Sequence, residues 1–412
     1  MACKSRLSNY LRDLYKDKNS EDDHANAVVT LNAVRLCFLV AACTSKCCKT
    51  DTVPEQLHLS LGAHPSEMVV SWLTYEPMLR PSVFFWEQGK TASIGNVAAT
   101  TSTYTEGGWQ GTIYNATLSG LKMGTSYRYR INGTSSGDGD ERVVESTFTT
   151  SAGPSVKALT PRSLHTGQTP YVPGKSAGVV AYFGDMSTTK SAKEVSESLL
   201  VLASNHSVQL VVQGGDLAYA DGDESVWDEY MRMVQDFARQ IPVMTAPGNH
   251  ENYYDFAAYD HRYFMPWQDS GSQQYYSFNY EKIHFVSWSY EQENGTDLVP
   301  GGSQHVWLQA DLAKANKERH LRPWVVLFGH RPFYCSADSK DCINVAPELR
   351  SLMEDLINEY HVDVVLQAHK HNYERTYPVY QSEPTARNYD DPAAPMYYVV
   401  GTGGVSHSPL SF

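Results

Sequence analysis

The second half of the chain alternates short apolar segments with segments of helical periodicity, and this alternation restricts the fold more than any other feature. We expect helices at 190–204, 225–240, 303–317 and 346–360. The apolar segments have the length and β-branched content of buried strands, and they read "AGVVAYFGD", "SVQLVVQGGD", "IPVMTAPGNHE", "PWVVLFGH" and "VDVVLQAH". Strands that alternate with helices predict an α/β layered domain with a largely parallel sheet, here over residues 177–412.

Residues 52–150 follow an all-β pattern instead. Short alternating runs such as "EQLHLSL", "MVVSWLTY" and "SYRYRING" are separated by Gly, Pro and Ser. Their spacing predicts a small β-sandwich of immunoglobulin or fibronectin type III, without a cluster of catalytic residues. Residues 151–176, rich in Ser, Thr, Pro and Gly, are expected to form a linker or a wrapping loop.

Composition narrows the class of protein. A chain of 412 residues with 42% hydrophobic and 19% charged residues has enough apolar material for packed cores, and its length fits two domains. The formal net charge of −13 argues against a broad nucleic-acid surface. A local positive site inside such an acidic protein is still compatible with this charge, because bound metal ions provide one.

The first fifty residues form an N-terminal extension with one apolar segment. Residues 34–43, "VRLCFLVAAC", resemble the hydrophobic region of a signal peptide and are too short to span a bilayer. The polar residues before them are unusual for a secretory signal, so two interpretations stay open. Either translation starts downstream of Met1, or the cysteines that follow are lipidated. No other segment predicts a membrane span.

Cysteines and sequons indicate an oxidising compartment. Five of the seven cysteines lie in the first fifty residues, and Cys335 and Cys342 form a close pair in "CSADSKDC". This pair predicts a local disulfide, with two free thiols as the alternative. Together with sequons at four positions, the pair favours a secreted or lumenal glycoprotein, lysosomal proteins included; the sequons are Asn115, Asn132, Asn205 and Asn294.

Polar residues follow the predicted strands at the point where each strand ends. They are Asp185, Asp216, Asn249 with His250, His330, and His369 with His371. Each alone has an ordinary structural explanation, for example a helix cap for Asp216 or a satisfied core histidine for His330. Five strand ends that carry only Asp, Asn and His indicate a ligand site at this edge of the sheet. If the strand continues, His369 and His371 point to the same face, because side chains in extended backbone alternate.

These residue types are ligands of hard to borderline metal ions. Their number suits two ions, because a mononuclear site needs only three or four protein ligands. Asp216 is the best candidate for a bridging carboxylate. Tyr219, three residues later, offers a phenolate suited to trivalent iron, and a packed aromatic ring with a hydrogen-bonded hydroxyl is the alternative.

The order of five short motifs resembles a known family. "GDMS", "GDLAY", "GNHE", "VLFGH" and "AHKH" occur in the order of the metal-binding blocks of purple acid phosphatases, which are calcineurin-like metallophosphoesterases. The resemblance covers about 177–403, and the preceding sandwich resembles the fibronectin-like domain of larger members. The animal high-mass group is the most similar. Ser187 and Ala368 stand where the family usually carries glycine.

The resemblance implies a role for each residue. Asp185, Tyr219 and His371 would bind iron(III). Asn249, His330 and His369 would bind a divalent ion (iron, zinc or manganese), and Asp216 would bridge both. His250 would face the substrate as a hydrogen-bond donor or general acid, or else only orient its turn. "RPFYCSADSKDC" lacks the histidines that plant members carry there, so the acid that protonates the leaving group is not identified.

The resemblance also implies an activity. We expect an acid phosphatase that hydrolyses small phosphate monoesters by attack of a metal-bound hydroxide at an Fe(III)–M(II) centre. Two alternatives remain: a phosphodiesterase or nucleotide phosphatase with the same metals, and a catalytically silent secreted glycoprotein that binds through its sandwich. Relatives continue beyond "MYYVVGTGGVSHSPLSF", so we expect a C-terminally truncated chain with an incomplete second sheet. The oligomeric state has no signature in the sequence.

Overall fold

The computed structural model describes residues 53–90, 95–134, 144–153 and 178–406. These residues belong to one compact unit, Thr52–Phe412. The expected N-terminal extension and nearly all of the expected linker lie outside the described residues. Within the described ranges, none of the helices combines the length and the apolarity that crossing a bilayer requires.

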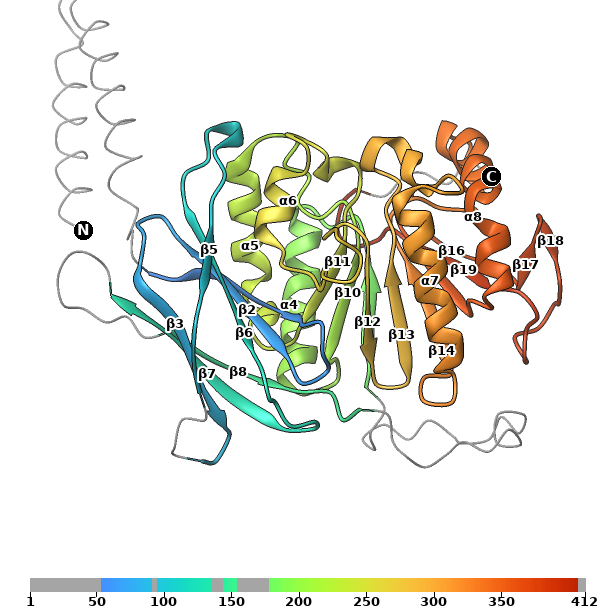
Figure 1. Ribbon diagram of the computed structural model, residues 1–412. Helices are drawn as coiled ribbons and strands as arrows, with labels where there is room; N and C mark the ends of the chain where they lie inside the picture. The colour runs from blue at the N-terminus through green and yellow to red at the C-terminus, as the bar shows by residue number, and fades with distance from the viewer. Residues whose placement is uncertain (1–52, 91–94, 135–143, 154–177, 407–412) are drawn as a thin grey trace, which may run out of the picture. The chain divides into compact units, whose positions relative to one another are not determined.

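The first part of the unit is the predicted β-sandwich (Figure 1). One antiparallel sheet has the order β1 (Glu55–Leu61), β2 (Met68–Thr74), β6 (Thr112–Leu118), β5 (Thr100–Ser102). The other has the order β4 (Gly95–Ala98), β3 (Leu79–Glu87), β7 (Ser126–Thr134), β8 (Val144–Thr149). Alternate residues of both sheets point inward and form a shared core that includes Trp72, Tyr114 and Tyr129. A short helical turn, η1 (Glu106–Gly108), follows β5.

The remainder is the predicted α/β domain, and it contains two main sheets. The parallel sheet has the order β11 (Val243–Ala246), β10 (Leu210–Gly214), β9 (Val180–Phe183). The mixed sheet has the order β12 (Tyr276–Tyr280), β13 (Ile283–Ser287), β14 (Trp324–Phe328), β15 (Val364–Gln367), β19 (Met396–Val400), β16 (Tyr373–Arg375). A small pair, β17 (Val379–Tyr380) and β18 (Glu383–Pro384), lies apart from them.

Helices cover both sides of these sheets (Figure 1). The structure contains α4 (Lys190–Ser204), α5 (Glu224–Ala238), α6 (Ala257–Arg262), α7 (Ser303–Lys317) and α8 (Ala346–Glu359). Helices α4 and α7 have the predicted bounds, and α5 and α8 differ by one or two residues. Three short helical segments complete the description: η2 (Asn249–Glu251), η3 (Gln292–Leu298) and η4 (Asp341–Val345).

Successive side chains of the strands point to opposite faces of the sheet and pack into two separate hydrophobic cores. On β14, Val326 and Phe328 belong to a cluster that includes residues of both sheets, α4 and α5. Val325 and Leu327, which point the other way, belong to a cluster with α7 and α8. The sequence does not predict the β12–β13 hairpin, because β12 alternates buried and half-buried residues and offers no continuous apolar run.

A buried arginine joins the sandwich to the α/β domain. Arg262, at the end of α6, is 1% exposed. Its guanidinium donates to Asp228 Oδ1 of α5 (3.0 Å), to Gln56 Oε1 (2.9 Å) and to the Tyr104 hydroxyl (2.8 Å). It also lies 4.7 Å from the centroid of the Trp109 ring. Three of these four partners belong to the sandwich region, so one cation ties the two parts together.

Candidate metal centre

The candidate residues gather at one edge of the α/β domain because their strands are parallel. β9, β10 and β11 run in one direction in the first sheet, and β14 and β15 run parallel in the second. The two sheets meet at this edge, where the Gly184 amide donates to the Val400 carbonyl (2.9 Å). Each predicted ligand except Tyr219 and His371 follows its strand by at most three residues. This arrangement agrees with the rule that ligand sites form at the carboxyl ends of parallel strands.

One half of the cluster consists of Asp185, Tyr219 and His371. The Tyr219 hydroxyl donates to Asp185 Oδ1 (2.9 Å) and lies 3.0 Å from His371 Nε2. His371 Nε2 lies 3.3 Å from the same Asp185 oxygen. The Nδ1–H of His371 has an acceptor in the Ser406 carbonyl (2.9 Å), so Nε2 is the nitrogen that faces the cluster.

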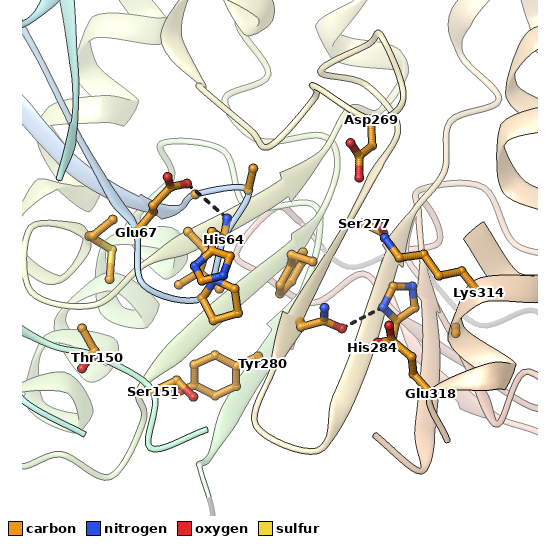
Figure 2. Close-up of a pocket in the computed structure, with 18 residues that line it drawn as sticks. His64, Glu67, Thr150, Ser151, Asp269, Ser277, Tyr280, His284, Lys314 and Glu318 are labelled. Carbon is orange, nitrogen blue, oxygen red and sulfur yellow. Dashed lines mark hydrogen bonds between the residues drawn. The ribbon is translucent and has the colours of Figure 1, made fainter. Parts of the chain in front are cut away.

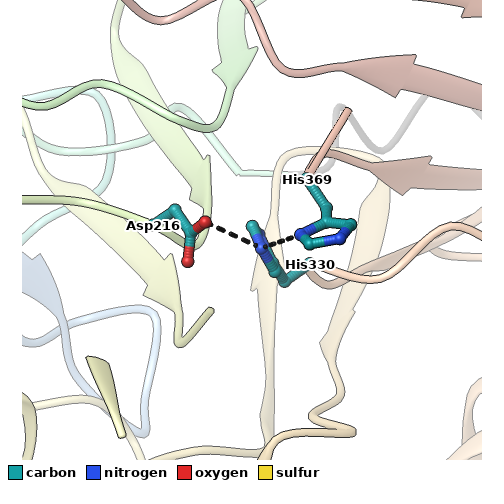
Figure 3. A group of neighbouring side chains, drawn as sticks. All are labelled: Asp216, His330 and His369. Atoms are coloured by element: carbon teal, nitrogen blue, oxygen red, sulfur yellow. Dashed lines mark hydrogen bonds and ion pairs between the residues drawn. The ribbon is translucent and has the colours of Figure 1, made fainter. Parts of the chain in front are cut away.

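The other half consists of Asn249, His330 and His369, with Asp216 beside them. Figure 3 shows Asp216, His330 and His369. His330 Nε2 lies 3.1 Å from Asp216 Oδ2, 3.2 Å from Asn249 Oδ1 and 3.0 Å from His369 Nδ1. The Nδ1–H of His330 donates to the Gly214 carbonyl (2.9 Å), which directs Nε2 at the other three side chains. Ligand atoms of Asp216, His330 and His369 lie within 4.8 Å of one another.

The spacing and chemistry of both donor sets fit metal ions. Two bonds of about 2.1 Å at a right angle place the ligand atoms about 3.0 Å apart, which matches the separations above. The donors are carboxylate, phenol, amide and imidazole groups with their nitrogen or oxygen atoms convergent. This set suits hard and borderline cations.

The pKa values of His330, Asp216 and Tyr219 depend on the charges of their neighbours in the cluster. Burial alone lowers the pKa of His330, but the Asp216 carboxylate outweighs burial and raises this pKa to about 9. Burial would raise the pKa of Asp216, yet His330 holds it well below its ordinary range. Burial, followed by the carboxylates of Asp185 and Asp216, raises the pKa of Tyr219 far above its ordinary value. Its phenol therefore keeps its proton until a cation replaces it.

His250 lies beside the cluster and is partly exposed. Its ring packs on Tyr219 with centroids 4.2 Å apart, and its side chain is 30% exposed. Nδ1 lies 2.5 Å from Asp221 Oδ1, and Nε2 lies 3.8 Å from Asp216 Oδ2. Asp221 is a functional candidate that our sequence analysis missed, although it stands only two residues after Tyr219.

Glu251 is a second missed residue, and it holds two site loops together. It is 2% exposed and accepts hydrogen bonds from the amides of Asp216 (2.8 Å), Leu217 (2.9 Å) and Gly248 (2.8 Å). Burial and the Asp216 charge raise its pKa to about 7, and the amide donors act in the opposite direction. Gly248 is required here because a Cβ atom would lie 2.2 Å from Asp216 Oδ1. Glu251 is the last residue of the "GNHE" motif, and its place in that motif could have identified it from the sequence.

The backbone corrects our explanation of the two strand-end histidines. β15 ends at Gln367, and His369 has a φ of 67°. The two imidazoles therefore leave a bend, so the two-residue period of a strand was the wrong reason for their placement. They also face different neighbours, His330 for His369 and Tyr219 for His371. Asp185, Asp216 and Tyr219 also have left-handed φ angles (61°, 50° and 53°).

Cys335 and Cys342 lie as a disulfide requires, with sulfurs 2.00 Å apart. Among the sequons, Asn205 is exposed and Asn132 is half-buried, so both are accessible. Asn115 is 8% exposed and its Oδ1 accepts from Ser71 Oγ (2.6 Å), which corrects our expectation that it is a glycan acceptor. The side chain of Asn294 lies outside the described residues.

A separate pocket lies between the β1–β2 loop, the β12–β13 hairpin and α7 (Figure 2). His284 lies in it and contacts Asn279 Oδ1 (2.9 Å) and Asp311 Oδ2 (2.8 Å). His284 pairs with Val325, near the start of β14, whereas His330 follows the end of that strand. The pocket is therefore remote from the candidate metal centre, and its lining contains none of the predicted site residues.

Comparisons with known proteins agree with this architecture. Residues 179–373 match the calcineurin-like phosphoesterase family, and residues 54–150 match the purple acid phosphatase N-terminal domain. Fold and site thus define a calcineurin-like phosphoesterase. The relatives are more specific: human acid phosphatase type 7 is 33% identical, with 86% of this chain and 78% of that protein aligned. The chain belongs to the purple acid phosphatase family, a family of acid phosphatases.

One further relative agrees with the family, and one solved structure agrees with the fold. A probable purple acid phosphatase of Arabidopsis thaliana is 31% identical, with 86% of this chain and 74% of that protein aligned. The structure of a purple acid phosphatase from yellow lupin seeds superposes with a TM-score of 0.72 at 23% identity. That superposition covers 87% of this chain and 66% of the lupin chain, and it supports the fold.

Proposed function

We propose that this protein hydrolyses phosphate monoesters at a binuclear metal centre. The observation that carries the proposal is the convergence of two donor sets, with the Asp216 carboxylate 3.1 Å from His330 and electrostatically coupled to Tyr219. Asp185, Tyr219 and His371 would hold iron(III). Asn249, His330 and His369 would hold a divalent ion (zinc, iron or manganese), and Asp216 would contribute to both half-sites.

When bound, the two ions would lower the pKa of a coordinated water and neutralise the phosphate dianion. The residues around them have separate tasks. Glu251 keeps the loops of Asp216 and Asn249 at a fixed separation through three amide hydrogen bonds. The carbonyl acceptors of His330 and His371 fix which imidazole nitrogen faces the centre.

His250 would donate a proton or a hydrogen bond to the substrate. Its Nδ1 is held by Asp221 at 2.5 Å, which leaves Nε2 directed toward the cluster. The Asp221 contact fixes the orientation of the ring, so Nε2 is the nitrogen that would donate to a leaving oxygen of the substrate. This assignment is compatible with a histidine-free "RPFYCSADSKDC" segment.

We also propose a secreted or lumenal location for this phosphatase. The disulfide-distance pair Cys335–Cys342 and the accessible sequons at Asn132 and Asn205 support it. A secretory fate predicts a mass shift on treatment of the native protein with an N-glycosidase. Protein from the natural source that lacked both glycan and disulfide would overturn this location.

The activity is tested with purified, metal-analysed protein. We expect about two metal ions per chain, one of them iron, and turnover of a phosphate monoester near pH 5 in preference to a diester. Preference for the diester would establish a phosphodiesterase on the same metals. Metal-loaded protein that hydrolyses neither ester would leave the silent glycoprotein as the correct interpretation.

Tyr219 provides a spectroscopic test that is independent of turnover. Coordination of a phenolate to iron(III) should give a visible charge-transfer band. The Tyr219→Phe variant should lose this band while it keeps its fold, because the ring still packs against His250. A band that persists in the Tyr219→Phe variant would remove Tyr219 from the proposed ligand set.

A further inference from the structure

His369 faces the candidate metal centre differently from the other two histidines. His330 and His371 direct Nε2 at the cluster and donate Nδ1–H to backbone carbonyls. His369 instead directs Nδ1 at His330, and its Nε2 lies 3.0 Å from the carboxylate of Asp341. The group that decides the protonation pattern of this ring is therefore a side chain from another part of the sequence.

Asp341 is held from several sides. Its Oδ2 accepts from Lys370 Nζ (2.6 Å), and its Oδ1 accepts from Arg331 Nη1 (2.9 Å). Arg331 is in turn fixed by Glu291, whose two oxygens lie 2.6 and 3.2 Å from its guanidinium. The Asp341 side chain is only 26% exposed. This network leaves the carboxylate little freedom to move away from His369.

Hydrogen-bond chemistry then selects one tautomer of His369. A carboxylate can only accept, and the guanidinium of Arg331, also 3.0 Å from Nε2, can only donate. Arg331 Nη1 already donates one of its two hydrogens to Asp341, whereas the Asp341 oxygen 3.0 Å from Nε2 can form a hydrogen bond with the ring only if Nε2 carries a hydrogen, so the favourable pattern places a hydrogen on Nε2 of His369. Nδ1 then carries the lone pair, in the direction of His330 and Asp216. The opposite tautomer would set a lone pair against the Asp341 carboxylate.

Asp341 also belongs to a closed loop. It directly precedes Cys342, whose sulfur pairs with Cys335, and the two Cα atoms lie 5.5 Å apart. Asp341 begins η4, which leads directly into α8. The disulfide on one side and the helix on the other therefore restrict the position of the Asp341 carboxylate.

We infer that Asp341 is a positioning residue that fixes His369 as an Nδ1 ligand of the divalent half-site, and that the Cys335–Cys342 ring holds Asp341 in place. The inference rests on the proposed function for the identity of the ligand set. A carboxylate behind a metal-binding histidine orients the ring and increases its basicity, and loss of such a partner typically weakens metal affinity about 10- to 100-fold.

The first experiment compares Asp341→Ala with Asp338→Ala, an exposed aspartate of the same loop. Zinc affinity is measured by competition with a chelator on iron-loaded protein. We expect Asp341→Ala to bind zinc about 10-fold or more weakly, with the iron charge-transfer band unchanged, and Asp338→Ala to match the wild type. Asp341→Asn, which keeps one acceptor oxygen, should give an intermediate loss. Equal zinc affinities for the two alanine variants would overturn the inference.

A second measurement needs no metal. Selective ¹⁵N labelling of histidine reports which ring nitrogen of His369 carries hydrogen in the metal-free protein, with the signal assigned by its loss in His369→Gln. We expect Nε2–H in the wild type and in Asp338→Ala, and a mixture in Asp341→Ala. If the wild-type protein bound no metal, the proposed function would fail while this tautomer test still decided the role of Asp341. A wild-type Nδ1–H signal would refute that role.

A third experiment tests whether the Cys335–Cys342 disulfide holds Asp341 in place, and it uses the double variant Cys335→Ser/Cys342→Ser. Circular dichroism and the midpoint of thermal unfolding establish first that it is folded. We expect its zinc affinity to fall by a smaller factor than that of Asp341→Ala, because the network of Lys370 and Arg331 remains. Wild-type affinity in the folded double variant would show that the ring has no part in positioning Asp341.

Discussion

At the scale of single residues, the candidate centre depends on backbone conformations that most side chains avoid. Asp185, Asp216, Tyr219 and His369 all have φ angles between 50° and 67°. Such conformations cost of order 1 kcal/mol each for non-glycine residues and persist only where surrounding contacts fix them. Glu251 provides such contacts for Asp216 and Leu217. Its carboxylate is therefore a structural requirement of the site.

We predict that Glu251→Gln weakens the site without removing bulk. The two carboxylate oxygens accept from three amides, and the glutamine NH₂ group would face at least one of these donors. A buried unsatisfied donor costs about 1–3 kcal/mol, so the free energy of unfolding should fall by about that amount. Urea denaturation and metal content measure the two effects. Unchanged stability together with full metal content would show that these amides do not need the carboxylate.

Asp260 gives a stability prediction with a defined pH dependence. Burial, assisted by the charge of Asp255, raises its pKa to about 6, although a hydrogen bond from Gln274 acts in the other direction. Since its pKa in the unfolded chain is about 3.9, the folded state binds the proton more tightly. Ionisation of Asp260 therefore costs stability as the pH rises from about 4 to about 6.

The Asp260→Asn variant removes this cost. We expect it to be more stable than the wild type by about 1–2 kcal/mol at pH 7, after a discount for partial exposure, and to lose this advantage near pH 4. Thermal or urea unfolding at the two pH values measures the difference. An advantage of equal size at pH 4 and pH 7 would mean that ionisation of Asp260 is not its cause.

At the scale of elements, the strand ends were predictable and the loops between them were not. Parallel strands bring their carboxyl ends to one edge, so the sequence sufficed to group Asp185, Asp216 and His330. The contact of Asp341 with His369 has no periodic signal, because it depends on how a loop and a bend meet in space. The same holds for the bend after β15, where a left-handed residue replaces the expected extended chain.

Arg262 of helix α6 supports a prediction about the contact between the β-sandwich and the α/β domain. Replacement of Arg262 by leucine would leave Asp228 and Glu224 buried without their cation. Removing one partner of a buried ion pair typically costs about 3–5 kcal/mol. Arg232→Leu is the matched control, because its ion pair with Glu55 is partly exposed and worth about 1 kcal/mol or less. Comparable losses of unfolding free energy in both variants would contradict a special role for Arg262.

At the scale of the whole molecule, the Arg262 network implies that the sandwich and the α/β domain unfold together. Calorimetry of the metal-free protein should show one transition, and metal loading should raise its midpoint. A ligand at 100 times its dissociation constant stabilises the folded state by about 2.7 kcal/mol. Two separated transitions, with only the second sensitive to metal, would show that the contact between the two parts contributes little to cooperativity.

The bend after β15 supplies one imidazole to each half of the candidate centre, and its consequence concerns the order in which ions load. Because both imidazoles leave the same short backbone segment, an ion that fixes this segment through one imidazole also positions the other imidazole for the second ion, so the two binding equilibria are linked. Metal titration of the empty protein should therefore be sigmoidal, with a Hill coefficient above 1. His371→Ala should weaken metal binding at the half-site of Asn249, His330 and His369 as well, even though His371 is not one of its proposed ligands.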